Sequence, residues 1–221
     1  MIKVFIAIVF LIVPLFLLYL NIVHPNIGGR YIFSVFALFI MAERIWETFF
    51  TSKEKNVRQF HGDWTLMLTS LIYFFTCLLI IIEFFYIDRE RNLFILSLGI
   101  LVFLLSAFIR YWAVKTLGNQ WAIHAVGESK IQSEKHILIK NGPYKYIRHP
   151  IYLGTILELT GIALISNTYF VLFFILFIDI PLYIIRAVHE EKTSMLRFGN
   201  DYMDYIEKTS FMIPLKFPKK R

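Results

Sequence analysis

The sequence has a single cysteine and few charged residues for its length. Cys77 is the one cysteine in 221 residues, which excludes a disulfide framework and a CxxC metal or redox site. Charged residues make up 18% of the chain and hydrophobic residues 57%, whereas soluble domains have about a quarter charged and about 45–50% apolar residues. The mean hydropathy is +0.62. This composition argues against a water-soluble globular protein.

Nucleotide-binding glycine loops and internal repeats are also absent from the sequence. There is no GxGxxG and no GxxxxGK[ST] segment, so neither common phosphate-binding loop is present. A transporter built from inverted repeats is disfavoured because the sequence shows no internal repeat. A non-enzymatic membrane scaffold would leave the polar segments of the chain unexplained. The net charge of +7 does not require a nucleic acid, because the basic residues lie beside apolar runs. We predict no metal site, no nucleic-acid partner and no obligate protein partner.

Long uncharged runs are the main feature that the sequence does have. A bilayer span needs about 20 mostly apolar residues, and the candidates are a run ending near Leu20, residues 31–50, 64–82 and 92–109, and the tract 151–185. Residues 166–168 divide that tract into two helices of a hairpin, each a little short for a full span. The first run is too long for a cleaved signal peptide. We therefore predict an all-α polytopic membrane protein with about six transmembrane helices.

The distribution of basic residues predicts the orientation in the membrane. With six spans, 18 of the 23 Lys and Arg residues fall on the side that holds both termini. Cytoplasmic loops carry such an excess, so we expect both termini in the cytoplasm. Residues 1–114 would then hold four spans, and residues 115–221 a cytoplasmic loop, the helical hairpin 150–186 and a C-terminal cytoplasmic helix.

Two polar segments on that side have enough side chains to build a site. In the first, Pro150 suits the first position of a helix, so His149 lies where the loop enters the membrane and Tyr152 lies on the first turn inside. A helix start of this kind favours an anionic group. In the second segment, Arg186 and Glu190 are four residues apart and share a helix face. The alternatives are an interfacial belt of Arg and Tyr residues and an ordinary surface ion pair.

The two segments together resemble a known enzyme family. Gly-Pro-Tyr-x-Tyr-x-Arg-His-Pro-x-Tyr-x-Gly at 142–154, Arg-x-x-x-Glu-Glu at 186–191 and Phe-Gly-x-x-Tyr-x-x-Tyr at 198–205 are similar to the isoprenylcysteine carboxyl methyltransferases, which are integral membrane enzymes that use S-adenosylmethionine (SAM). The resemblance implies that a cytoplasmic cap, formed by the loop before the fifth helix and the C-terminal helix, holds the cofactor. It implies that Arg186 orients the substrate, that Glu190 faces the cofactor, and that the other SAM-binding residues are His136, Ile137, Leu138, Ile139, Tyr144, His149, Pro150, Ile151 and Tyr152.

The chemistry agrees with these residue types. A carboxylate acceptor is already ionised at neutral pH, so the protein needs to orient the reactants and exclude water, and the planar guanidinium of Arg186 suits a carboxylate or an enolate. The acceptor is a lipophilic carboxylate, enol or hydroxyl, such as a prenylated cysteine. An NADPH-dependent sterol-type reductase and a phospholipid amine N-methyltransferase remain alternatives. Adjacent carboxylates at 190 and 191 disfavour a 2′-phosphate dinucleotide.

Glu43 and Glu47 lie in the second run and are expected to form, with Arg44, a buried polar cluster that supports the site. Three more carboxylates lie in or near the later runs. We expect Glu83 to reach water at the end of its span. Glu158 and Asp179 lie deeper, where carboxylates are usually paired or functional. Either of them could pair with Arg110. Alternatively, Asp179 could line a tunnel for the acceptor.

Overall fold

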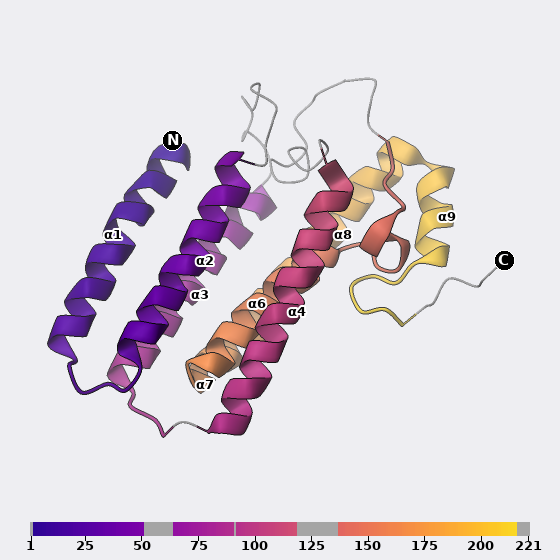
Figure 1. Cartoon of the computed structure of the whole chain (residues 1–221). Helices are drawn as coiled ribbons and strands as arrows, with labels where there is room; N and C mark the ends of the chain where they lie inside the picture. The colour runs from indigo at the N-terminus through magenta and orange to yellow at the C-terminus, as the bar shows by residue number, and fades with distance from the viewer. Residues whose placement is uncertain (1, 51–63, 91, 119–136, 216–221) are drawn as a thin grey trace.

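The computed structural model describes residues 2–50, 64–90, 92–118 and 137–215, and this part of the chain is helical apart from turns and one isolated bridge between Ile147 and Ser210. This confirms the predicted all-helical fold class. In chain order the helices are α1 (Ile2–Val23), α2 (Arg30–Phe50), α3 (Trp64–Tyr86), α4 (Leu93–Leu117), the 3-10 helix η2 (Gly142–Lys145), α6 (Pro150–Ile165), α7 (Tyr169–Phe174), the π-helical turn η3 (Ile175–Asp179), α8 (Ile180–Phe198) and α9 (Asn200–Lys208) (Figure 1).

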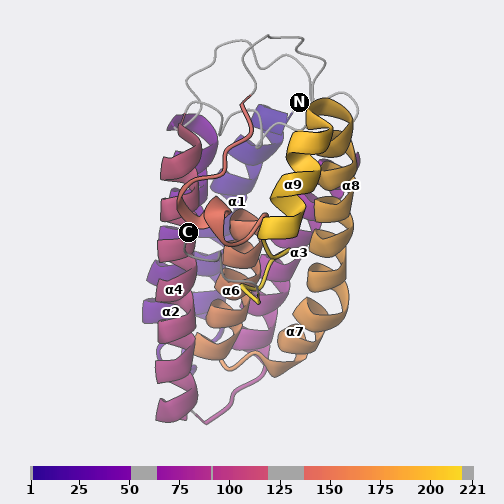
Figure 2. The ribbon, with the colours of Figure 1, turned by 90° about the vertical axis from the view of Figure 1, so that its right-hand side faces the viewer.

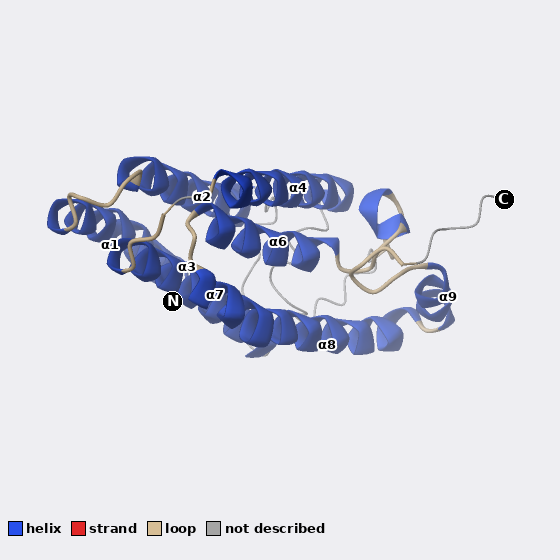
Figure 3. Cartoon of the chain, turned by 90° about the horizontal axis from the view of Figure 1, so that it is seen from below, coloured by secondary structure: helices blue, strands red, loops and turns tan. Residues whose placement is uncertain are grey.

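The long helices form an up-and-down bundle in which α6 is central. Seen along the bundle, α6 lies between α4 on one side and the row formed by α3, α7 and α8 on the other (Figure 3). The α4–α6 contact is the most extensive of the fold, and α3 contacts both α7 and α8. Helices α1 and α2 pack against each other at the edge of the bundle (Figure 1).

Three helical stretches of the described residues are long and apolar enough to cross a membrane. They are Trp64–Tyr86, Leu93–Leu117 and the continuous stretch Tyr169–Phe198. The described apolar parts of α1 and α2 and the whole of α6 are shorter, so six remains a predicted number of spans. The predicted boundary between residues 114 and 115 falls within α4 and also remains a prediction.

The prediction of a hairpin of two short helices is wrong for the second helix. Helix α6 has 16 residues, which extend about 24 Å, but the following stretch is 30 residues long. Pro181 has no N–H to donate, and the π-helical turn directly before it lets the helix continue past the missing hydrogen bond. The helix then runs on beyond the apolar tract, and this extension presents Arg186 and Glu190 on successive turns.

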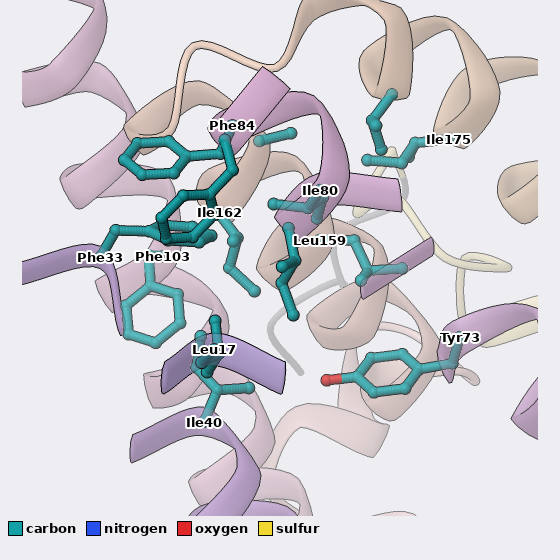
Figure 4. Close-up of a cluster of buried hydrophobic side chains, with 14 of the residues drawn as sticks. Leu17, Phe33, Ile40, Tyr73, Ile80, Phe84, Phe103, Leu159, Ile162 and Ile175 are labelled. Carbon is teal, nitrogen blue, oxygen red and sulfur yellow. The ribbon is translucent and has the colours of Figure 1, made fainter. Parts of the chain in front are cut away.

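The core gathers aromatic and aliphatic side chains from all the long helices. The rings of Phe33 and Phe84 stack with centroids 4.0 Å apart, and Leu159, Ile162 and Ile175 are buried beside them (Figure 4). Cys77 is partly buried against this cluster.

Glycine allows the close approach of α4 and α6. A Cβ atom on Gly161 would lie 2.8 Å from the backbone nitrogen of Phe103, and one on Gly99 would lie 2.8 Å from the backbone nitrogen of Ile165. Because these neighbours are backbone atoms, no side-chain rotation can relieve either clash.

We expect Gly161→Ala to destabilise the protein by about 1–3 kcal/mol, as overpacking of a dense core does. The helix propensity gained by alanine, up to about 1 kcal/mol, opposes this loss. The thermal midpoint in detergent measures the effect, and Gly28→Ala, where a Cβ would meet nothing within 4 Å, is the control. A midpoint equal to or above that of the wild type would contradict the proposed packing.

A buried ion pair joins α4 to α6. Arg110 Nη1 contacts Glu158 Oε2, and Tyr73 of α3 donates a hydrogen bond of 2.9 Å to the other carboxylate oxygen of Glu158. Arg110 and Glu158 are 2% and 1% exposed. Gly154 makes room for the pair, since a Cβ there would overlap the Arg110 side chain. The expected pairing of Glu158 with Arg110 is therefore confirmed.

The other two carboxylates have different partners. Asp179 is fully buried, and both of its oxygens accept from the Thr76 hydroxyl of α3, at 3.0 and 3.1 Å. The prediction that Glu83 reaches water is wrong. Glu83 is 6% exposed and binds Arg89 at 2.5 Å, and it accepts the backbone N–H groups of residues 170 and 171. The turn between α6 and α7 packs against α3 here, which a pattern along α3 alone does not reveal.

Candidate active site

The segment before α6 packs against the segment that follows α9. Gly142 has a φ of +57°, and its missing side chain leaves space for Thr116 of α4. After the short helix η2, the N–H of Arg148 donates to the carbonyls of Ser210 and Phe211, at 3.0 and 3.1 Å. The N–H of His149 also donates to the carbonyl of Phe211. Figure 2 shows α9 beside the end of α8 and in front of this segment.

Glu191 of α8 holds the residues that precede α6. One of its oxygens accepts Arg148 Nε at 2.5 Å and lies 3.1 Å from His149 Nε2. Arg148 also donates to the carbonyl of Thr209 at 2.8 Å. No site role was predicted for Glu191 from the sequence, although it follows Glu190 directly. Adjacent helical residues face different directions, so the two carboxylates serve different partners.

Arg186, Glu190 and Tyr152 form a second cluster one turn away. Arg186 is 2% exposed; its Nε donates to the Tyr152 hydroxyl at 2.6 Å, and its Nη2 donates to Glu190 at 2.9 Å. The Tyr152 hydroxyl in turn donates to the same Glu190 oxygen. Arg186 Nη1 donates to the hydroxyl of Thr65 in α3 at 3.3 Å. The predicted i,i+4 pairing is therefore confirmed, but it is buried and has additional partners, so the alternative of a surface ion pair does not apply.

Aromatic rings connect the two clusters. The His149 and Tyr152 rings lie nearly parallel, at 10°, with centroids 5.7 Å apart, and Phe211 meets the His149 ring edge-on at 5.0 Å. Tyr183 of α8 lies against Tyr152 from the other side. The ring of His149 is therefore fixed by an ion partner and two aromatic neighbours.

Helix α9 contributes two buried tyrosines, for which the sequence motif by itself indicated no role. Tyr205 donates a hydrogen bond of 2.7 Å to the backbone carbonyl of Tyr144, and Tyr202 is buried beside it. Burial raises the pKa of Tyr144, Tyr202 and Tyr205 above the ordinary tyrosine value. These phenols therefore stay neutral at physiological pH, and that of Tyr205 serves as a hydrogen-bond donor.

The structure brings most of the predicted cofactor residues to this junction. Tyr144 is buried, and Ile139 and Ile151 pack against the same cluster on α4. Pro150 occupies the first turn of α6. Ile137 is 67% exposed and Leu138 is half-buried, both without regular structure. His136 lies outside the described residues, as do Trp121 and His124, which precede the motif and could also contact the cofactor or lie at the membrane interface. The side chains of Glu43, Arg44 and Glu47 are also outside the described part.

The residues present fit a nucleoside that carries an amino acid. Among the described residues, the backbone of Ile137–Ile139 makes no hydrogen bond with the rest of the protein. Its polar groups can therefore bind a base edge or a ribose. The Glu190 carboxylate is 20% exposed and uses one oxygen for both of its contacts, so its other oxygen can accept from an ammonium group. No cluster of potential metal ligands occurs among the described residues.

Comparison with known proteins shows which family the chain resembles. The model of the isoprenylcysteine carboxyl methyltransferase (ICMT) family matches residues 98–196, which run from α4 into α8. Over this segment the chain is similar to the ICMT family. The matched segment contains both ion clusters, together with the α4–α6 contact that supports them.

Individual proteins match parts of the chain. A *Bacillus subtilis* protein described as uncharacterized protein YpbQ is 37% identical over 33% of this chain and 40% of its own length. A *Saccharomyces cerevisiae* protein-S-isoprenylcysteine O-methyltransferase is 32% identical over 53% of this chain and 48% of its own length. The chain thus spans about half or less of these relatives. The structure of a eukaryotic intramembrane Ras methyltransferase ICMT aligns with the whole chain and 88% of its own, at 18% identity and a TM-score of 0.48.

Proposed function

We propose that the protein is a SAM-dependent O-methyltransferase that acts on the carboxylate of a lipophilic substrate, such as a prenylated cysteine, at the cytoplasmic face of a membrane. The observation that carries this proposal is the arrangement around Arg186. The Nε and Nη2 atoms form the edge of a guanidinium that binds a carboxylate with two parallel hydrogen bonds. That edge already holds two oxygens, one from Tyr152 and one from Glu190.

An acceptor carboxylate would take the place of these two oxygens on Arg186. The guanidinium remains charged and its Thr65 contact holds it in the bundle. Because Arg186 is almost fully buried, a carboxylate bound there would be shielded from water, which strengthens its interaction with the cation. The apolar spans around the site suit the lipophilic part of such a substrate.

A different set of residues would hold SAM. The backbone of Ile137–Ile139 and the side chain of Tyr144 would contact the nucleoside, and Glu190 would bind the amino group. His149, held by Glu191, would orient the cofactor. When bound, SAM supplies a methyl group on a sulfonium for in-line transfer. A carboxylate needs no deprotonation at neutral pH, so His149 has an orienting role and no base is required.

Glu190→Gln is expected to weaken SAM binding about tenfold, because it removes the charge that would pair with the ammonium group, a bond worth about 1.5–3 kcal/mol. Calorimetric titration of SAM into the detergent-purified protein measures this change. Glu207→Gln on the exposed face of α9 is the control and should bind as the wild type does. Unchanged SAM affinity in Glu190→Gln would contradict the assigned role.

The reaction itself is tested with SAM carrying a labelled methyl group and S-farnesylcysteine with a blocked amino group. The proposal expects a base-labile methyl ester, which distinguishes O-methylation from N-methylation. A titration with NADPH runs in parallel. Binding of NADPH without SAM would overturn the methyltransferase proposal in favour of a reductase, and label in a stable methylamine of a phospholipid would favour an N-methyltransferase.

A further inference from the structure

Two adjoining cavities lie where α3 ends and α7 begins. Figure 1 shows that these helix ends are at the end of the bundle away from α9. The larger, of about 290 Å³, lies between α3 and α7, and almost its whole lining is apolar: Leu79, Ile82, Glu83, Tyr86, Ile87, Phe170, Val171 and Phe174. The smaller, of about 170 Å³, has a mixed lining: Ile27, Gly28, Phe84, Ile87, Asp88, Arg89, Ser166 and Asn167. Ile87 lines both cavities.

The apolar cavity runs in the direction of a lipid chain. Its outer residues, Tyr86 and Phe170, lie at the ends of α3 and α7, where exposed aromatic side chains are typical of the membrane interface. Its inner residues, Leu79 and Phe174, lie one to two turns deeper along the two helices. An acyl chain entering at the level of Tyr86 would therefore follow the helices towards the middle of the bundle.

The polar cavity presents donors suited to a phosphate. Arg89 uses Nη1 for both of its hydrogen bonds, to Glu83 and to the carbonyl of Asn167, each 2.5 Å long. Its Nε and Nη2 make no hydrogen bond with the described residues. Asn167 is 7% exposed, and its side-chain oxygen accepts from Tyr169. Its side-chain nitrogen makes no hydrogen bond in the described part of the chain. Arg89 and Asn167 both line the small cavity, and this guanidinium edge and this amide nitrogen have no acceptor among the described residues.

The charged residues near the polar cavity indicate which kind of phosphate group it would bind. Glu83 neutralises Arg89, and Asp88 and Glu90 are exposed next to it. The described charged residues from 83 to 90 are therefore net negative, and neither the turn at residues 27–28 nor that at residues 166–168 contributes a charged side chain. A phosphate that carries its own cationic group fits this arrangement better than one with a net negative charge.

We propose that these two cavities bind one phospholipid with a zwitterionic head group. The phosphate is held by Arg89 and Asn167, the cationic end of the head group lies towards Asp88, and one acyl chain occupies the cavity between α3 and α7. This site is at the opposite end of the bundle from Arg186, and its existence is independent of the proposed methyl transfer.

The test is native mass spectrometry of the full chain, delipidated in detergent and then mixed with palmitoyl-oleoyl phosphatidylethanolamine or the matching phosphatidylglycerol. We expect a one-to-one complex with phosphatidylethanolamine, at an affinity about tenfold higher than for phosphatidylglycerol. Arg89→Lys keeps the charge beside Glu83 but loses the planar edge, and should weaken the complex about tenfold. Asn167→Gly tolerates the positive φ of 56° at this position and removes the side-chain amide. This variant should also bind phosphatidylethanolamine more weakly.

The position of the acyl chain is tested with two tryptophan variants. Ile82→Trp fills the apolar cavity and should abolish the complex. Ile100→Trp, on a similarly exposed apolar surface of α4, should bind as the wild type does. Equal binding of the two lipids would overturn the head-group assignment, and wild-type binding by Ile82→Trp would overturn the location. Circular dichroism and the thermal midpoint establish that each variant is folded.

Discussion

Replacing Arg186 with lysine is expected to reduce kcat/KM for methyl transfer by at least about a hundredfold, in line with the loss of a preorganised hydrogen-bond donor in other enzymes. Lysine retains the positive charge, but a single ammonium group cannot present the Nε and Nη2 edge that holds two oxygens in this structure. The acceptor carboxylate would then be bound as a point charge, without a fixed orientation towards the methyl group. Initial rates with labelled SAM and S-farnesylcysteine measure the effect.

Binding of SAM separates this role from a general structural one. We expect Arg186→Lys to bind SAM within about threefold of the wild type, which is less than 1 kcal/mol, because Arg186 is not itself a proposed cofactor contact and lysine keeps the positive charge beside Glu190. Arg197→Lys is the matched control, since Arg197 is exposed on the same helix. Retention of more than a third of the wild-type kcat/KM by Arg186→Lys would show that the edge of the guanidinium does not orient the acceptor.

The second large effect is expected at the buried pair of Arg110 and Glu158. Arg110→Met leaves the Glu158 carboxylate buried with Tyr73 as a remaining partner. Removing one member of a buried ion pair costs about 3–5 kcal/mol, mostly because the other charge is left uncompensated. We therefore expect a large fall in the thermal midpoint of the detergent-solubilised protein, and a smaller yield of folded protein.

A double variant distinguishes loss of packing from loss of charge compensation. Arg110→Met with Glu158→Leu removes both charges and should recover most of the stability, because apolar replacements of a buried pair are often neutral or stabilising. The coupling in this double-mutant cycle is therefore expected to be large and favourable. A double variant that is as unstable as the sum of the single variants would indicate that the pair contributes through packing alone.

Patterns along the chain were sufficient to predict the helices and the contacts between residues of the same helix. The uncharged runs indicated the apolar helices, and Asn92 marked the start of α4, where its side chain accepts the N–H groups of Phe94 and Ile95. The spacing of Arg186 and Glu190 predicted their contact, because residues four apart on a helix are neighbours. These features depend on helical periodicity and on local capping, which a short window of sequence contains.

Contacts between different helices could not be predicted from such local patterns. Thr65 meets Arg186 across 121 positions, and Tyr73 meets Glu158 across 85. Glu83 was expected in water because it stands near the end of an apolar run, but the first turn of α7 packs against it. The sixth predicted helix was too short because the polar residues after Ile185 do not show by themselves whether the helix continues.

The sequence by itself determined that the chain is helical and apolar, which family it resembles, and which residue types stand at the junction of loop and membrane. Hydrophobic composition and motif order carry that information without any knowledge of packing. Only the tertiary structure decided that Tyr152 joins the pair of Arg186 and Glu190 while Glu191 holds Arg148 and His149. Only packing also paired Arg110 with Glu158 and left a polar cavity beside Arg89. These outcomes depend on which faces of distant helices meet, and that is set by the fit of side chains across the whole bundle.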